Sequence, residues 1–390
     1  MKSILLLLGL LSFTIAEESQ LLKQFSEGYD NFTTHIYKEL IRSTSKNFIV
    51  CPLSVDVLLA LISSGAEGET SKQITNALNL PEKHEDVHKT FSDLSPYLQG
   101  NDKYDLTAAN KIYIKEGFNI SDKYLNISKD IFNAEIQSVN FTNNVETANE
   151  INKWVENKTH NKITNIVNPS IFDVNTINVL INAIYFHGKW VKEFDEMFSA
   201  RSSFHVNRNS SVETDTMLLV NECEYYESIE LEAKFLKLDY QGGDVSMHIV
   251  LPNDIEGLAA LEEKMTDVLI PPPYEMYSVY ATVPKFKIET EIKFIPILQS
   301  LGIKDLFEDT ADLRGILAEQ ENLSVSEVIQ KAFIEVDEKG TTAAATTFAL
   351  IDIRSGNSNS AFFNADHPFL FYLRLNKVGI NFFVGRYISP

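Results

Sequence analysis

The chain has 390 residues, of which 44% are hydrophobic and 23% are charged, so it is long and apolar enough to bury a large core. This composition excludes intrinsically disordered and fibrous proteins. The formal net charge of -20 disfavours a general affinity for nucleic acids or for anionic membrane surfaces.

The first sixteen residues have the pattern of a secretory signal peptide. Lys2 precedes an apolar run that ends at Leu11, and the small residue Ala16 stands before two glutamates. An apolar run this short does not span a bilayer, which needs about 20 residues. We therefore predict that residues 1–16 are removed and that the protein is secreted. No linker rich in Pro, Gly or Ser divides residues 17–390, so we predict one domain there.

Secretion would turn the N-x-Ser/Thr triplets of the chain into candidate acceptors for glycans. Six of them begin at Asn31, Asn119, Asn126, Asn157, Asn209 and Asn322. A seventh, at Asn140, lies in a segment with the pattern of a half-buried strand, which makes it the least suitable. Cys51 and Cys223 are the only cysteines, and we favour two free thiols, although one disulfide between them stays open.

Helical and strand patterns are mixed along the chain. Apolar residues recur at spacings of three and four in residues 18–43, which predicts a helix with one apolar stripe. A second apolar helix follows Pro52. Strands are predicted as a hairpin over 235–252, at 286–289, at 326–336, and as two runs over 369–388. Because strands and helices do not alternate as βαβ units, the pattern favours an α+β fold.

Motifs for enzymatic chemistry are weak. His84 to His88 match H-E-x-x-H, which on a helix places two imidazoles on one face for zinc. The match lacks a third ligand and has charged neighbours, so a polar surface helix is the better interpretation and we predict no metal site. The chain has neither a G-x-S-x-G nor a G-x-x-x-x-G-K-[ST] motif, so hydrolase and nucleotide-binding functions have no support.

The most informative segment follows the strand predicted at 326–336. In a strand, Thr341, Ala343, Ala345 and Thr347 would share one face with residues 349, 351 and 353, and every one of these side chains is small or apolar. Residues 354–360 have the composition of an exposed loop. The residues alone leave two interpretations open, a strand with one buried side and a flexible surface linker.

This segment resembles the reactive-loop hinge of serpins, in which a glutamate, a variable residue, a glycine and a threonine or serine precede a run of alanines. The matching residues are Glu338, Gly340, Thr341, Ala343, Ala344, Ala345 and Thr347. Other segments resemble serpin signatures in the same order along the chain, at 47–54, 65–70, 182–190, 284–289, 301–303, 367–371 and 384–390. The chain is thus identified as a member of this family and is most similar to secreted serpins of arthropods.

The resemblance implies helices around a large mixed β-sheet that accepts the reactive loop, about 338–361, as an added strand. The catalytic serine of a target protease attacks the scissile carbonyl, and loop insertion traps the acyl-enzyme. Family spacing places the scissile residue about seventeenth, counted from Glu338, which gives the bond Arg354–Ser355. An arginine implies a trypsin-like target, because its guanidinium pairs with an acidic group in the specificity pocket. Asp352 and Ile353 narrow the choice of enzyme.

Two residues depart from the family pattern, which usually has Ser at the position of Cys51 and His at that of Gln330. By resemblance, both belong to the region where the sheet opens, together with Ser54, Asn182 and Trp190. A glutamine still donates and accepts hydrogen bonds. We therefore expect the sheet to open with altered energetics.

The competing hypothesis is a non-inhibitory serpin that acts as a carrier or chaperone, in which bulky or charged residues usually spoil the hinge. The intact hinge favours an inhibitor that forms a covalent one-to-one complex with an Arg-specific protease. We expect a monomer without cofactor, nucleic-acid or membrane partner, in an extracellular cascade such as innate immunity. Activation by glycosaminoglycans would need a basic surface, for which Lys158 and Lys162 are a faint hint.

Overall fold

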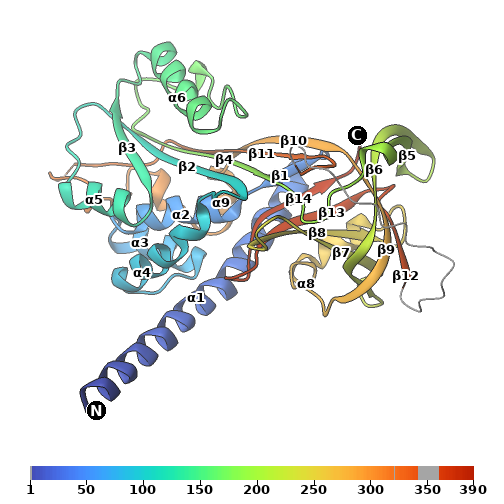
Figure 1. Ribbon diagram of the computed structural model, residues 1–390. Coiled ribbons are helices and arrows are strands. Elements are labelled where there is room, and N and C mark those ends of the chain that lie inside the picture. The colour runs from blue at the N-terminus through green and yellow to red at the C-terminus, as the bar shows by residue number, and fades with distance from the viewer. Residues whose placement is uncertain (1, 320, 341–359) are drawn as a thin grey trace.

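The computed structural model describes residues 2–319, 321–340 and 360–390, with side chains described from Leu21 onward. The described chain forms two β-sheets with helices packed around them (Figure 1). The α-helices are α1 (Lys2–Ser43), α2 (Pro52–Ser63), α3 (Gly68–Leu78), α4 (His84–Leu94), α5 (Asp122–Asp130), α6 (Asn144–Lys158), α7 (Leu258–Glu263), α8 (Met265–Val268) and α9 (Ile295–Ser300). Short 3-10 helices lie at Ser95–Leu98, Pro169–Ile171, Glu196–Phe198 and Asp305–Phe307.

The smaller sheet has five strands and a mixed topology. Its order is β10 (Phe286–Lys293), β11 (Glu327–Val336), β4 (Asn178–Gly188), β2 (Tyr104–Lys115) and β3 (Ala134–Val139). Strands β11 and β4 are parallel neighbours, with Gln330 opposite Asn182. Strands β4 and β2 are antiparallel, with Asn182 opposite Asn110. Three amide side chains therefore stand in one row across the middle of this sheet.

The larger sheet has nine strands and contains the C-terminus. Its order is β1 (Phe48–Val50), β14 (Ile380–Tyr387), β13 (Phe369–Leu375), β8 (Val245–Pro252), β7 (Ala233–Asp239), β6 (Ser210–Ser228), β9 (Glu275–Pro284) and β12 (Ser360–Asn364), and β5 (Ala200–Asn207) also pairs with β6. Strand β12 runs parallel to β9 at the edge of the sheet. The first strand after the predicted loop is thus an edge strand.

Helices cover both faces of the five-stranded sheet. Helix α2, which is buried along its whole length, lies below it, and α6 lies above it (Figure 1). Under α6 is a separate small core that joins Ile151 and Val155 of α6 to residues of β4 and to Ile329 and Phe333 of β11. This core therefore spans the boundary between β4 and β11.

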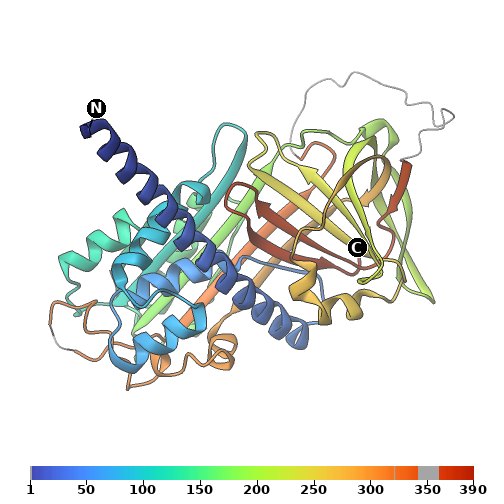
Figure 2. The ribbon, with the colours of Figure 1, turned by 90° about the horizontal axis from the view of Figure 1, so that it is seen from below.

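The sequence predicted some of these elements. The strand pattern at 326–336, the hairpin over 235–252 and the two C-terminal runs are confirmed as strands. The first helix is longer than predicted, because it begins at Lys2 and includes the apolar run of residues 4–11. From below, α1 lies across the base of the molecule and reaches α8 (Figure 2). Among the described helices, none is long and apolar enough to cross a membrane, and removal of residues 1–16 stays a prediction.

Candidate functional site

The predicted reactive loop connects the two sheets. Strand β11 ends at Val336, and the chain enters β12 of the other sheet at Ser360. The predicted residues Thr341, Ala343, Ala344, Ala345, Thr347, Asp352, Ile353, Arg354 and Ser355 lie outside the described residues. The structure therefore defines the two points at which the loop is attached. Among the predicted hinge residues, it describes Glu338 and Gly340.

Glu338 anchors the start of the hinge. Its side chain is buried, its Oε1 lies 2.5 Å from the Lys285 Nζ, and it also accepts a hydrogen bond from the Ser199 hydroxyl. Burial acts to raise the pKa of Glu338, but the hydrogen bonds from Lys285 and Ser199 outweigh burial and hold this pKa below its ordinary value. The carboxylate is thus charged at neutral pH. It fixes the hinge to Lys285, which directly precedes β10, and to Ser199, which directly precedes β5.

The backbone of residues 337–340 is held against the end of β4. Trp190 donates from its backbone N to Lys339 O at 3.2 Å and from Nε1 to Asp337 O at 2.9 Å. Gly340 has φ +64°, and a Cβ there would lie 2.4 Å from Gly188 O. Only glycine fits this conformation and this close approach, which explains the glycine of the hinge. The last described residues before the loop therefore lie beside the end of β4.

Gln330 lies at the centre of the five-stranded sheet and is fully buried. Its Oε1 accepts from the Cys51 backbone N at 2.9 Å, and its Nε2 donates to Cys51 O at 2.8 Å and to Asn182 Oδ1 at 2.7 Å. One amide therefore satisfies both backbone groups at the residue that caps α2 and also bonds across the boundary between β11 and β4. This geometry explains why glutamine is accepted at this position.

The row of amides continues onto β2 and includes the start of α2. The Asn182 Nδ2 donates to Asn110 Oδ1 at 2.7 Å, and the Ser54 Oγ donates to the Cys51 Sγ at 3.3 Å. Burial raises the pKa of Cys51 to about 12, so its thiol is neutral. Within the described ranges, no ion pair joins β4 to β11. Neutral hydrogen bonds and the small core under α6 hold this boundary closed.

The structure divides the predicted sheet-opening residues into two clusters. Ser54, Asn182 and Gln330 lie together at the centre, whereas Trp190 lies with the hinge, eight residues beyond Asn182, which is roughly 25 Å along an extended chain. Sequence reasoning missed Asn110, whose signal was an amide inside a mostly apolar strand. It also missed Lys285 and Ser199, which are far from Glu338 in the sequence and gave no signal.

Other predicted positions can be placed. The six candidate glycan acceptors are exposed, whereas Asn140 is half-buried and its Oδ1 accepts hydrogen bonds from Thr142. Cys51 and Cys223 are free and buried. The residues from His84 to His88 form the start of α4, and no group of metal-binding side chains occurs in the described part of the chain. Lys158 and Lys162 are each paired with a glutamate, so they form no free basic patch.

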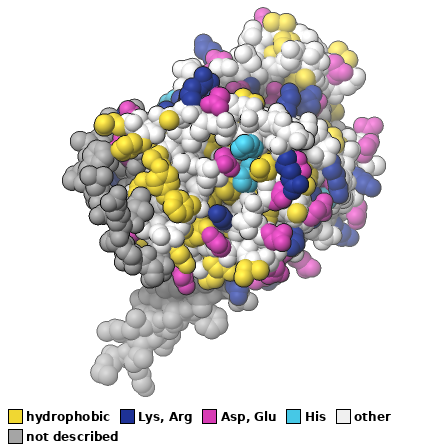
Figure 3. Space-filling view, turned by 90° about the vertical axis from the view of Figure 1, so that its right-hand side faces the viewer, with side chains coloured by type: hydrophobic (Ala, Val, Ile, Leu, Met, Phe, Trp, Pro, Cys, Tyr) yellow, Lys and Arg dark blue, Asp and Glu magenta, His cyan; other side chains and the backbone are white. Residues whose placement is uncertain are grey.

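An apolar row borders the second attachment point of the loop. Val220, Tyr280 and Phe362 stand opposite one another on β6, β9 and β12, and Phe362 is 64% exposed. The Tyr280 and Phe362 rings lie 5.9 Å apart. On the side of the molecule that carries these strands, hydrophobic side chains gather into a band (Figure 3). This row lies on the edge strand by which the chain re-enters the sheet after the predicted loop.

We predict that Gln330→Ala destabilises the native protein. The change removes a hydrogen-bond partner from the backbone N and O of Cys51 and from the Asn182 Oδ1, all in a buried site. The free energy of unfolding should therefore fall by about 3 kcal/mol. Urea unfolding followed by circular dichroism measures the loss. The matched control is Gln137→Ala in β3 of the same sheet, because Gln137 makes an exposed hydrogen bond to Glu150. Equal midpoints for both variants would contradict a structural role of the amide row.

Comparisons with known proteins agree on one family. The family model described as "Serpin (serine protease inhibitor)" matches residues 27–390. The chain is 35% identical to Alaserpin of Manduca sexta, with all of both chains covered. It is 37% identical to Serine protease inhibitor 42Dd of Drosophila melanogaster, with 91% of this chain and 95% of the relative covered. The crystal structure of Serpin48 from the insect Tenebrio molitor has a TM-score of 0.87 at 36% identity and covers 94% of this chain and 98% of its own.

Proposed function

The chain belongs to the serpin family of serine protease inhibitors, and we propose that it is a suicide substrate for trypsin-like enzymes, cleaved at Arg354–Ser355. The observation that carries this proposal is the hinge. Glu338 and Gly340 lie beside the end of β4, and the residues that follow are small on the face that would enter the sheet. Such a chain can fold back between β4 and β11.

The proposed reaction begins as ordinary proteolysis. The protease serine attacks the carbonyl of Arg354, the peptide bond to Ser355 breaks, and the new amino terminus leaves while Arg354 remains as an ester on the protease. The arginine is held by its charge-assisted hydrogen bonds to the acidic group of the specificity pocket. Cleavage frees the hinge from its second attachment at β12.

Insertion then competes with hydrolysis of the ester. Because β4 and β11 are parallel, a loop that folds back between them from Gly340 would form a strand antiparallel to both neighbours. About a dozen inserted residues gain roughly 1 kcal/mol for each new backbone hydrogen bond, together with apolar burial at ~25 cal/mol/Å². A free-energy gain of order 10 kcal/mol is thus available to move the attached protease and distort its active site before water reaches the ester.

The sequence supports an extracellular setting for this activity. The signal-peptide pattern of residues 1–16 supports secretion, and the exposed asparagines support a glycoprotein. We propose an extracellular monomer that forms a covalent one-to-one complex with an Arg-specific protease. Arg-specific proteases act in extracellular cascades such as those of innate immunity, and we propose that the protein regulates one of them. The steps above need no cofactor.

Incubation with a panel of Arg-specific proteases tests this proposal. Denaturing gel electrophoresis should show a complex of inhibitor and protease that survives denaturant, and mass spectrometry should find a released peptide that begins at Ser355 and ends at Pro390. A chymotrypsin-like protease serves as the control. A chain that neither forms a complex nor is cleaved at Arg354 would instead fit the carrier or chaperone hypothesis.

A further inference from the structure

A cavity of about 630 Å³ opens at the edge of the nine-stranded sheet, beside the first residues of β12. The end of β6, the start of β7 and the start of β9 form its other walls. It exists because β12 pairs with β9 only from Ser278 onward, so the first residues of β9 lie beyond the reach of this edge strand. The volume is within the range of small-molecule sites.

Four side chains that line the cavity lie on one face of the sheet. Tyr225 of β6 stands opposite Glu275 of β9, and Glu227 follows Tyr225 by two residues in its strand. Tyr277 follows Glu275 by two residues in β9. Side chains two residues apart in a strand point to the same face, so two tyrosines and two glutamates come together here. The Tyr225 and Tyr277 rings lie 5.3 Å apart.

Tyr225 connects the aromatic wall to one of the carboxylates. It is 2% exposed, and its hydroxyl donates a hydrogen bond to the Glu227 carboxylate. Burial and this hydrogen bond raise the pKa of Tyr225, so the phenol stays protonated and continues to donate. The bond therefore holds the Glu227 carboxylate beside the rings. Aromatic faces attract cations, and a carboxylate next to them adds to that attraction.

The charge of the cavity walls is negative. Glu227 and Glu275 form no ion pair within the described ranges. Lys234 of β7 stands opposite Glu227, but its Nζ donates to Phe362 O at 3.2 Å. The two carboxylates thus exceed the one ammonium group by one unit of charge, which favours a positively charged ligand.

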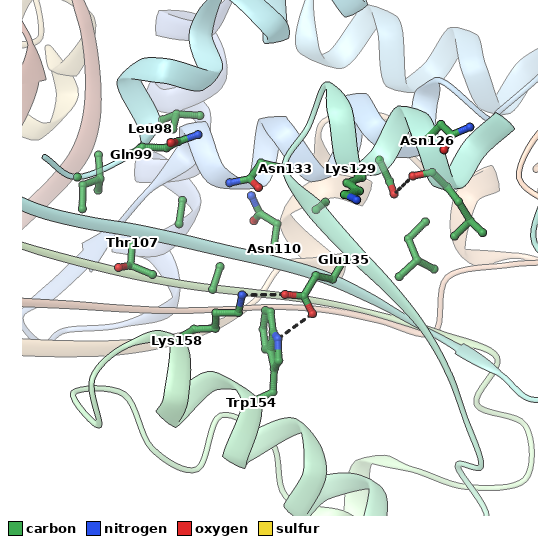
Figure 4. Close-up of a pocket in the computed structure, with 18 residues that line it drawn as sticks. Leu98, Gln99, Thr107, Asn110, Asn126, Lys129, Asn133, Glu135, Trp154 and Lys158 are labelled. Atoms are coloured by element: carbon green, nitrogen blue, oxygen red, sulfur yellow. Dashed lines mark hydrogen bonds and ion pairs between the residues drawn. The ribbon is translucent and has the colours of Figure 1, made fainter. Parts of the chain in front are cut away.

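A second cavity, at the edge of the five-stranded sheet, shows the contrast (Figure 4). Its one carboxylate, Glu135, lies 2.8 Å from the Lys158 Nζ and 3.2 Å from the Lys111 Nζ, and it accepts a hydrogen bond from Trp154 Nε1. That carboxylate is already neutralised by the protein itself. The two glutamates beside β12 remain available to a ligand.

We propose that the cavity beside β12 binds a small organic ammonium ion with an aromatic body, such as an arylalkylamine. The ammonium group pairs with Glu227 and Glu275, and the aromatic body packs against Tyr225 and Tyr277. This binding does not depend on the inhibitory function proposed above. Because Ser360 at the start of β12 also lines the cavity, a bound ligand contacts the strand by which the chain re-enters the sheet, and it stabilises the native protein.

Calorimetric titration with 2-phenylethylamine tests this site, and 2-phenylethanol, which has the same aromatic body without the charge, is the control ligand. The amine should bind saturably and one to one, and at saturation it should raise the midpoint of thermal unfolding. Glu227→Gln and Glu275→Gln should each weaken binding about threefold, and the double change about tenfold. Glu230→Gln is the matched control, because it removes the same charge from a nearby exposed residue that does not line the cavity.

Equal affinity for the amine and the alcohol, or equal binding by the wild type and the double variant, would overturn the cation site. If the amine does not bind but the double variant slows complex formation with trypsin, the two carboxylates contact the protease and the ligand site is overturned. A protein that binds the amine but never inhibits trypsin would overturn the proposed function and leave this site standing.

Discussion

Arg354→Ala is expected to abolish inhibition of trypsin-like proteases. The guanidinium would pair with a buried acidic group of the enzyme, and removal of one partner from such a pair costs about 3–5 kcal/mol. At 1.4 kcal/mol for each factor of ten, the rate of complex formation should fall roughly 10²- to 4 × 10³-fold. Thermal unfolding should be unchanged, because the hinge anchors at Glu338 and Trp190 and the row of amides remain intact.

The control for this change is Arg201→Ala, which removes an exposed arginine of β5 and should leave inhibition as it was. Progress curves of trypsin activity at several inhibitor concentrations give the rate constants for both variants. If Arg354→Ala inhibits trypsin as fast as the wild type does, or if the released peptide begins at a residue other than Ser355, the scissile bond lies elsewhere.

Thr341→Arg should convert the inhibitor into a plain substrate. Thr341 follows Gly340, so it is the first residue that must enter the sheet on the small face of the loop. An arginine there would bring an unpaired charge into a buried site at a cost of several kcal/mol. Because this cost falls at the start of insertion, and each 1.4 kcal/mol slows a step about tenfold, hydrolysis of the acyl-enzyme should win.

Cleavage after Arg354 should continue at a similar rate in this variant, since the scissile residue and its neighbours are unchanged. The measurement is the number of inhibitor molecules consumed per protease inactivated, together with the yield of complex that resists denaturant. Thr342→Arg is the matched control, because its side chain falls on the opposite face of the strand. Unchanged values for Thr341→Arg would show that the hinge does not insert.

The sequence predicted the parts of the fold that depend on local pattern. Alternation and turn chemistry were sufficient for the hairpin over 235–252, and the apolar spacing in residues 18–43 was sufficient for the body of α1. The start of α1 was missed, because the apolar run of residues 4–11 was interpreted as a targeting signal without an assigned conformation.

Contacts between segments that are far apart in the chain could not be predicted from the sequence. Ser54, Asn182 and Gln330, which the resemblance places in one region, do lie together. The bonds from Gln330 to the backbone of Cys51, however, depend on how α2 packs under the sheet. The resemblance places Trp190 in the same region as these three residues. In the structure, Trp190 lies at the hinge instead, because β4 extends to Gly188 and separates it from Asn182. No local pattern could have joined Lys285 to Glu338.

The two departures from the family pattern form one interaction. Gln330 bonds both backbone groups of Cys51, and the Cys51 thiol accepts from Ser54. Since burial raises the pKa of Cys51 to about 12, this thiol stays neutral through the physiological range. A histidine at position 330 could change its charge near neutral pH, whereas the amide of Gln330 carries no charge at any pH in this range.

Thermal unfolding of the native and the cleaved protein tests the central claim most directly, which is that the loop becomes a strand between β4 and β11. Protein cleaved completely at Arg354, with both fragments retained, is compared with intact protein in the same buffer. If insertion contributes a free energy of order 10 kcal/mol, the midpoint of thermal unfolding should be at least about 15 °C higher for the cleaved form. Equal midpoints would mean that the freed loop does not insert, and trapping by insertion would be contradicted.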